Sequence, residues 1–383
     1  MYKIINKKKL IITAIADTVG KIVSFPFTMF RAQEPIDPAS VRSILVIRTA
    51  YLGDALMTLP MLKPLRERFT GASIAFLTAD SSAPALAGNA YIDEVIPFTP
   101  FWFYPNATLA GYFDFIKSFR KRRFDLVIEA RGDIREIMAI VAPARARYKV
   151  SYDVGGGGWL LTHVVPYTGL KHKVEYHLDI ARYLGCIAME TGWGVRFTPD
   201  EIAEADRILA ARGIAKPFAL VHPGSRLELK MWKPERYAEL ITRMTGQLGM
   251  NVALLGHPSE KAVTDAVMRN AGGAVSDLTG YLTVRQLMAV ISRAGLLVCN
   301  DSGPMHMAAA VGTPVAAVFG PSKSVETGPY GVKNRVVEKD FPCRRSCDES
   351  SCKYPERGSC MDAVAVDDVF KAVKELGCSN DQV

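Results

Sequence analysis

From residue 43 onward, short β-branched runs alternate with segments of helical periodicity, and this alternation most strongly limits what the chain can fold into. It predicts parallel sheets joined by crossover helices. We therefore expect an α/β fold with two Rossmann-like, doubly wound halves facing a central cleft, and ligands beyond the carboxyl ends of the strands. The expected strands are 43–48, 73–77, 93–97, 124–129, 218–221, 251–255, 296–299 and 314–318. The expected helices include 53–68, 81–88, 108–122, 199–212, 304–311 and 366–376.

The charge of the chain is concentrated at its start. The 383 residues carry a formal net charge of +8. The first 32 residues contain six basic side chains and one acidic one, so this stretch holds five of the eight excess charges and leaves +3 on the rest. A nucleic-acid binder should show a basic stripe or a recognisable module. The sequence has no zinc finger, RNP-type or helix-turn-helix signature, so we expect no nucleic-acid partner.

Residues 10–30 (LIITAIADTVGKIVSFPFTMF) are long enough to span a bilayer, but Asp17 and Lys21 lie near the middle and disfavour a plain transmembrane helix. As a helix, the segment has a polar stripe and an opposite apolar face. With the basic run at 7–9, this pattern predicts an amphipathic helix on an anionic membrane surface. The alternative is a helix that packs on the protein's own surface. Residues 31–42 are expected to form a linker.

Several common motifs are missing. The run Gly155–Gly158 (GGGG) is interpreted as a flexible loop, because it does not match the dinucleotide fingerprint, and no Walker motif occurs. The late cysteines Cys343, Cys347, Cys352 and Cys360 have the spacing C-x3-C-x4-C-x7-C, which matches no strong metal signature. Metal binding, disulfides and packed thiols all remain open for them.

Three segments that follow expected strands carry candidate chemistry. Asp54 follows the first strand beside Gly53, where an acid either caps the next helix or takes a proton from an acceptor hydroxyl. In the second half, His222–Arg226 (HPGSR) and Lys230 combine small polar donors with two cations, which suits an anionic ligand. The segment 300–306 (NDSGPMH) opens a helix: Ser302 can cap it, Gly303 permits close approach, and the helix amides suit a diphosphate. Asp301, His306 and, less strongly, Glu260 are further ligand contacts.

Four segments together resemble the successive motifs of glycosyltransferase family 9, the lipopolysaccharide heptosyltransferases. They are 43–60 (SILVIRTAYLGDALMTLP), 222–232, 300–311 (NDSGPMHMAAAV) and 318–321 (VFGP). The resemblance spans residues 43 to 375, and the NDSG-x-MH block is its most specific part. It implies a GT-B fold and metal-independent transfer with inversion at the sugar carbon, with no cofactor. The N-terminal extension is not part of the familiar core enzymes.

The resemblance also implies roles for individual residues. By position, Asp54 matches the proposed catalytic base of the family. Lys230, with Arg226 as its substitute, matches the lysine that binds the donor's phosphates. The remaining matches are donor-binding positions: Gly224, Ser225, Glu260, Asp301, Ser302, Gly303 and His306.

The expected organisation has four parts. They are a membrane-associating helix and linker (1–42), an acceptor-binding domain (43–195), a nucleotide-sugar-binding domain (196–342) and a Cys-rich segment with a C-terminal helix (343–383). On the acceptor side, Gly53, Lys121 and Arg122 are candidate contacts, although the basic run after residue 116 also suits a helix C-terminus.

The resemblance implies a peripheral enzyme at the cytoplasmic face of the inner membrane. It moves a heptose from ADP-heptose, or another nucleotide sugar, to a lipopolysaccharide core acceptor on lipid A. The alternatives are a GT-B-type nucleotide-sugar epimerase and a non-catalytic subunit that binds a sugar nucleotide or lipid.

Overall fold

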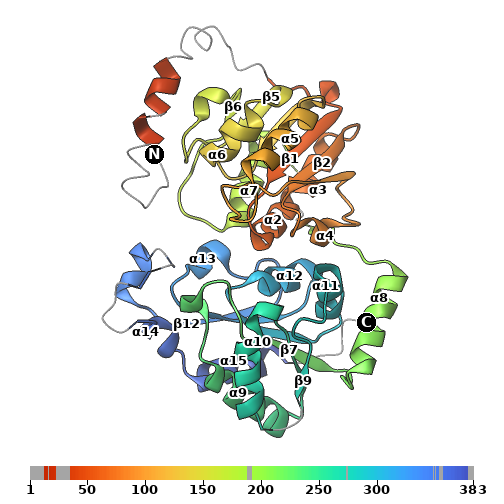
Figure 1. The fold of residues 1–383 in the computed structure, drawn as a ribbon, viewed down its shortest axis with the longest axis vertical. Coiled ribbons are helices and arrows are strands. Elements are labelled where there is room, and N and C mark those ends of the chain that lie inside the picture. Colours follow the sequence, from red (N-terminus) through yellow and green to blue (C-terminus); the bar gives the residue numbers. More distant parts are fainter. Residues whose placement is uncertain are drawn as a thin grey trace. The chain divides into compact units, whose positions relative to one another are not determined.

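The computed structural model describes residues 13–15, 17–22, 35–187, 192–272, 275–347, 349, 351–352 and 357–377 (Figure 1). The chain divides into two compact units, Met1–Gly194 and Val195–Val383. Each unit is built around one parallel sheet with flanking helices, so the predicted α/β class is confirmed. Within the described part of the chain, no helix is long and apolar enough to cross a membrane.

The first unit contains a six-stranded sheet in the order β3-β2-β1-β4-β5-β6. Its strands are β1 (Ser43–Arg48), β2 (Ser73–Thr78), β3 (Glu94–Pro97), β4 (Arg123–Glu129), β5 (Arg145–Ser151) and β6 (His163–Val164). The central strands are apolar along their whole length because both faces are covered; β1 is buried from Ile44 onward. The flanking elements are η1 (Pro38–Ser40), α2 (Leu52–Thr58), η2 (Leu59–Met61), α3 (Leu62–Arg68), α4 (Ala83–Leu86), α5 (Leu109–Phe119), α6 (Ile134–Glu136), η3 (Ile137–Val141), η4 (Gly158–Leu160) and α7 (Lys173–Tyr183).

The second unit repeats this plan. Its six strands lie in the order β12-β11-β10-β7-β8-β9. They are β7 (Phe218–His222), β8 (Asn251–Leu254), β9 (Val275–Asp277), β10 (Leu296–Asn300), β11 (Val315–Phe319) and β12 (Asn334–Glu338). When β7 to β12 are counted from one to six, both sheets have the Rossmann order 3-2-1-4-5-6. Each sheet therefore has one switch point, between β1 and β4 in the first unit and between β7 and β10 in the second.

Helices of the second unit pack around a core that includes the fully buried Trp232 and Tyr237. The C-terminal helix belongs to this core through Val369, Phe370 and Val373. The elements are α8 (Pro199–Ala211), η5 (Glu228–Lys230), α9 (Pro234–Leu248), η6 (Pro258–Glu260), α10 (Lys261–Asn270), α11 (Val284–Ser292), α12 (Gly303–Val311), α13 (Ser324–Thr327), η7 (Pro342–Ser346), α14 (Ser359–Asp362) and α15 (Val366–Leu376).

The structure contains four strands that the sequence analysis missed, namely β5, β6, β9 and β12. Their burial patterns explain the omission. β5 (RARYKVS) carries three basic side chains, and β9 and β12 are only partly buried along their length, so none shows the continuous apolar run that marked the other strands. β6 has two residues, which is too short for any periodicity.

Candidate functional site

Asp54 lies in the first turn of α2, directly after β1 and therefore at the switch point of the first sheet. Its carboxylate is not a helix cap. Oδ1 instead contacts two cations, Arg48 Nη2 at 2.8 Å and Lys173 Nζ at 3.1 Å. Burial alone would raise the pKa of Asp54, but Lys173, Arg48 and the nearby Arg131 outweigh it and hold this pKa well below the usual range. Asp54 is therefore a permanently ionised carboxylate at neutral pH.

Two buried glutamates, Glu129 and Glu136, hold the loops around the first switch point. Glu129 ends β4, and its oxygens accept hydrogen bonds from Arg131 N (3.0 Å), Gly132 N (2.6 Å) and Ser151 Oγ (2.5 Å). Glu136 Oε1 accepts from the backbone N–H of Thr49 at 3.0 Å and from the Thr49 hydroxyl. Since Thr49 follows Arg48 in the chain, Glu136 fixes the start of the β1–α2 loop.

The carboxylates of Glu129 and Glu136 lie close together in a buried site. Burial and the adjacent charge of Glu136 raise the pKa of Glu129 well above its usual range, which favours its protonated form. Glu136 Oε2 is buried without a hydrogen-bond partner.

In the second unit, the side chain of Asn300 ties together the loops at the switch point. Its Nδ2 donates to the carbonyls of Pro223 (2.8 Å) and Gly224 (3.2 Å), while its Oδ1 accepts from Trp232 N (3.1 Å) and Tyr237 Oη (2.9 Å). Asn300 is fully buried, and these four bonds satisfy every donor and acceptor of the amide. The loop after β7 is thereby held against the end of β10.

His222 connects two predicted ligand contacts, Glu260 and Ser302. Its Nε2 lies 3.1 Å from Glu260 Oε2, and its Nδ1 lies 3.1 Å from Ser302 Oγ. Gly224 is required here, because a Cβ at this position would lie 2.1 Å from Glu260 Oε1. The expectation that Ser302 caps α12 is wrong in detail: it occupies the N-cap position, but its side chain caps no amide and bonds to His222 instead.

Lys230 and Asp301 form a partly enclosed ion pair, with Nζ 2.8 Å from Asp301 Oδ2. Lys230 also lies 2.6 Å from Glu349 Oε2. Burial lowers the pKa of Lys230, but these two carboxylates outweigh it, so the pKa is raised and the ammonium is charged. Ser225 Oγ donates to the Asp301 carbonyl at 3.3 Å, which adds a further contact between the two loops.

The other predicted donor residues lie at the same edge of the sheet. Gly303 begins α12, and His306 is buried in the first turns of that helix. The charge of His306 is among the influences that lower the pKa of Asp301, after the opposing effect of burial and the larger effect of Lys230. Arg226 is exposed on the loop, and Lys230 is the more enclosed of the two candidate cations.

Two acceptor-side candidates do not lie near Asp54. Lys121 and Arg122 precede β4, at the amino edge of the first sheet, whereas Asp54 follows its carboxyl edge. A seven-residue strand separates these edges by about 20 Å. Arg122 forms an ion pair with Glu94 at the start of β3. Gly53, in contrast, lies in the first turn of α2 beside Asp54.

The described residues contain no group of three or more His, Cys, Asp or Glu side chains placed to hold a metal ion. The thiol of Cys360 is buried, and its pKa is raised by burial and then by Cys343, Cys347 and Cys352.

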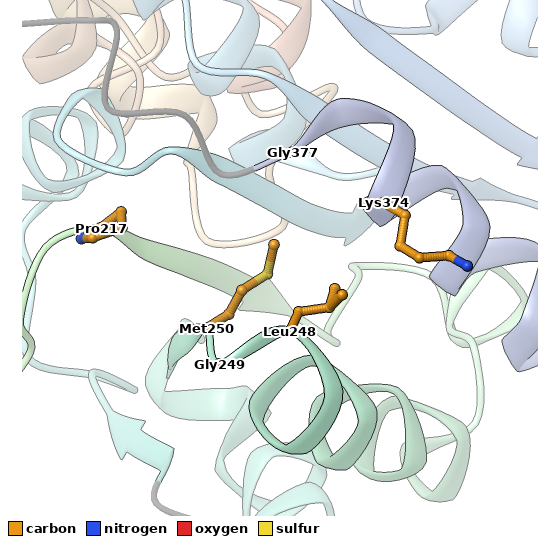
Figure 2. Close-up of a pocket in the computed structure, with 6 residues that line it drawn as sticks. All are labelled: Pro217, Leu248, Gly249, Met250, Lys374 and Gly377. Atoms are coloured by element: carbon orange, nitrogen blue, oxygen red, sulfur yellow. The ribbon is translucent and has the colours of Figure 1, made fainter.

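A cavity of about 300 Å³ lies elsewhere, at the amino edge of the second sheet (Figure 2). Its lining comes from the segments that precede β7 and β8 and from the end of α15: Pro217, Leu248, Gly249, Met250, Lys374 and Gly377. Because β7 and β8 are parallel, this edge is opposite the loops that carry Ser225 and Glu260. The cavity is not part of the candidate site.

Sequence reasoning assigned no role to four residues that organise the site, namely Arg48, Lys173, His222 and Asn300, although all but Lys173 lie within the motifs it singled out. Arg48, His222 and Asn300 are the last residues of β1, β7 and β10, and a polar residue that ends an otherwise apolar strand is a readable signal. Lys173 had no such signal, since it is separated from Asp54 by 119 positions in the chain.

Comparisons with known proteins identify the family of the chain. A family model described as "Glycosyltransferase family 9 (heptosyltransferase)" matches residues 112–355. The chain is 27% identical over 340 residues to lipopolysaccharide heptosyltransferase 3 of Escherichia coli K12, covering 85% of this chain and 95% of the relative.

Solved structures show the same fold. A glycosyl transferase family 9 protein from Veillonella parvula has a TM-score of 0.77 and 20% identity, covering 89% of this chain and 98% of that one. Heptosyltransferase WaaC of E. coli, solved with ADP, has a TM-score of 0.68 and 20% identity, covering 88% and 100%.

Proposed function

Because the chain belongs to glycosyltransferase family 9, the heptosyltransferase family, we propose that it transfers a heptose from ADP-heptose to a lipopolysaccharide inner-core acceptor, with inversion and without a metal ion. The names of its relatives support this donor and acceptor: several are lipopolysaccharide heptosyltransferases, and WaaC was solved with ADP. The observation that carries the proposal is the ionised carboxylate of Asp54 at the first switch point.

In the proposed reaction, Asp54 acts as the general base. Both cations contact Oδ1, so we assign the proton transfer to Oδ2. The acceptor hydroxyl gives its proton to Oδ2, and its oxygen attacks the anomeric carbon opposite the diphosphate. The bond between that carbon and the diphosphate oxygen breaks, and ADP leaves with the bonding electrons. Attack from the opposite face inverts the sugar carbon.

Lys173 gives the acceptor a way to adjust this base. A carboxylate with a very low pKa is a weak proton acceptor. The Lys173 side chain is 36% exposed, whereas the Arg48 side chain is 3% exposed, so Lys173 is the cation that an anionic acceptor reaches. If a phosphate or carboxylate of the acceptor draws Lys173 away, the pKa of Asp54 rises as the hydroxyl arrives.

The second switch point provides the donor site in this proposal. Lys230 exchanges its carboxylate partners for the donor's diphosphate, and the first turn of α12 adds its amides and helix dipole. Glu260, held by His222 and by the backbone N–H of His257 at 2.7 Å, is placed to accept hydrogen bonds from the ribose.

We further propose that the enzyme works as a peripheral protein on an anionic membrane surface, at the cytoplasmic face of the inner membrane. The acceptor class supports this location, since the relatives are named for lipopolysaccharide. The concentration of positive charge in the first 32 residues also supports it.

The test is transfer with purified components. We expect ADP release from ADP-heptose only when a heptose-deficient lipopolysaccharide is added, with the inverted anomer in the product by NMR and with unchanged rates in EDTA. Donor consumption without acceptor would favour an epimerase. Donor binding without turnover would favour a non-catalytic subunit, and no donor binding by folded protein would refute the donor assignment.

A further inference from the structure

The N-terminal helical segment, residues 13–15 and 17–22, faces the first unit with its polar side. Asp17 is 2% exposed, and its Oδ1 accepts a hydrogen bond from Gly157 N at 2.9 Å. Thr13 packs against Gly156, and Gly20 lies against the ring of Trp159. Figure 1 draws this segment in red beside α6.

The backbone of the glycine run 155–158 allows the helix to approach closely. Gly156 and Gly157 have φ values of +87° and +86°, in the left-handed region that favours glycine. A Cβ on Gly156 would lie 2.8 Å from Thr13 Cγ2, and one on Gly20 would lie 2.2 Å from the Trp159 ring. The run is a loop, as the sequence analysis expected, and it forms the surface that the helix contacts.

The apolar side of the same helix points away from the protein. Ile15, Val19 and Ile22 are 61%, 54% and 68% exposed. A helix that packs only on its own protein buries its apolar face and leaves polar groups in water. In this helix the polar side is buried against the protein and the apolar side is exposed to solvent. Packing on the protein therefore does not explain the apolar face.

We propose that this helix inserts Ile15, Val19 and Ile22 into an anionic bilayer while Asp17 and Gly20 hold it against the first unit. The partner of this apolar face is an anionic membrane, because the face lies in the stretch that carries five of the eight excess positive charges. Within this stretch, the side chain of Lys21 is 59% exposed. This inference rests on the proposed lipid-linked acceptor. The rigid attachment orients the unit that carries Asp54 on the surface where that acceptor lies.

The membrane contact is tested with the full-length Ile15→Ser/Ile22→Ser variant in flotation assays. We expect at least tenfold weaker binding to phosphatidylglycerol/phosphatidylcholine vesicles. The matched control Ile187→Ser/Val325→Ser removes two other exposed apolar side chains and should bind like the parent. Equal binding of the helix variant and the parent overturns the proposal. The proposal is also overturned if the parent protein binds pure phosphatidylcholine vesicles as strongly as the anionic vesicles.

The orienting role is tested with Asp17→Ala and Gly20→Leu. These variants disrupt the contacts of the helix with Gly157 and Trp159 but keep its apolar face. Vesicle binding should stay within about threefold of the parent, because the inserted side chains are unchanged. Transfer to acceptor embedded in vesicles should fall at least tenfold, with no change for a delipidated, soluble acceptor. Asp17→Asn keeps an oxygen for the Gly157 amide and should rescue transfer.

An equal response with both acceptors would overturn the orienting role. Failure of the parent protein to glycosylate even the soluble acceptor would instead contradict the proposed function. The two failures are therefore distinguishable.

Discussion

The two units have the same strand order but opposite chemistry at their switch points. Between β1 and β4, the first unit gathers three acidic side chains around Arg48 in a buried site. At the second switch point, between β7 and β10, Lys230 pairs with the carboxylates of Asp301 and Glu349, and His222 contacts Glu260 and Ser302. A shared topology thus fixes where a ligand site forms, while the residues that end the strands decide what the site can do.

The side chains that hold the loops in place at the two switch points also differ. The first unit holds its loop with Glu136, and the pKa of the neighbouring Glu129 is raised by burial and by the charge of Glu136. The second unit holds its loop with Asn300, a neutral amide that has no titration of its own. The first switch point is therefore sensitive to protonation and suits proton transfer, whereas the second suits tight binding of an anion.

The sharpest test of this division is Asp54→Asn. We expect kcat to fall by about 10² to 10⁴, the range typical of a general base, while donor affinity stays unchanged because the proposed donor site lies in the other unit. Steady-state kinetics and calorimetric titration with ADP-heptose measure the two effects. Asp80→Asn changes an exposed acid after β2, at the same sheet edge, and should leave kcat near the parental value. Near-normal turnover of Asp54→Asn would remove the assigned role.

The complementary test is Lys230→Met. Loss of a charged contact to phosphate should raise the donor KM by roughly ten- to hundredfold. The change in kcat should be smaller than for Asp54→Asn. Arg226→Met, an exposed cation on the same loop, should have a weaker effect on KM. If Arg226→Met has the larger effect instead, the phosphate contact belongs to Arg226.

The alternation of strands and helices was sufficient to predict the fold, because the central parallel strands are buried on both faces and are therefore mostly apolar. The prediction missed β5 and β12 because both carry charged side chains, such as Arg145 and Arg335. β12 is an edge strand, and β5 pairs with the two-residue β6 only at Val150 and Ser151. The site was only partly predictable. Asp54, Lys230 and Asp301 follow predicted strands, but Lys173, one of the two partners of Asp54, comes from a distant position that no local spacing reveals. Likewise, Lys121 and Arg122 were chosen for charge alone, and the register of β4 places them at the wrong edge.

The protonation contrast predicts a pH-dependent stability that belongs to the first unit. Because the pKa of Glu129 is raised in the fold, unfolding releases a proton at any pH between its unfolded and folded values. The free energy of unfolding should therefore fall as pH rises through this window, with a slope of at most about 1.4 kcal/mol per pH unit for one proton. Glu129→Gln should flatten this slope in urea titrations from pH 5 to 8. An unchanged slope would mean that Glu129 does not hold the proton.

The smallest expected effect is a shift in the acidic limb of the pH–rate profile. Asp54 is active when ionised, and its lowered pKa keeps it so until the pH falls through that low value. Removing Lys173 takes away the largest of the lowering influences, so Lys173→Met should move the acidic limb of kcat/KM to higher pH. Lys171→Met, two residues away and paired with Asp179, is the matched control and should not move it. If the limb stays in place in both variants, Lys173 does not set the basicity of Asp54, and Arg48 and Arg131 must hold that carboxylate ionised.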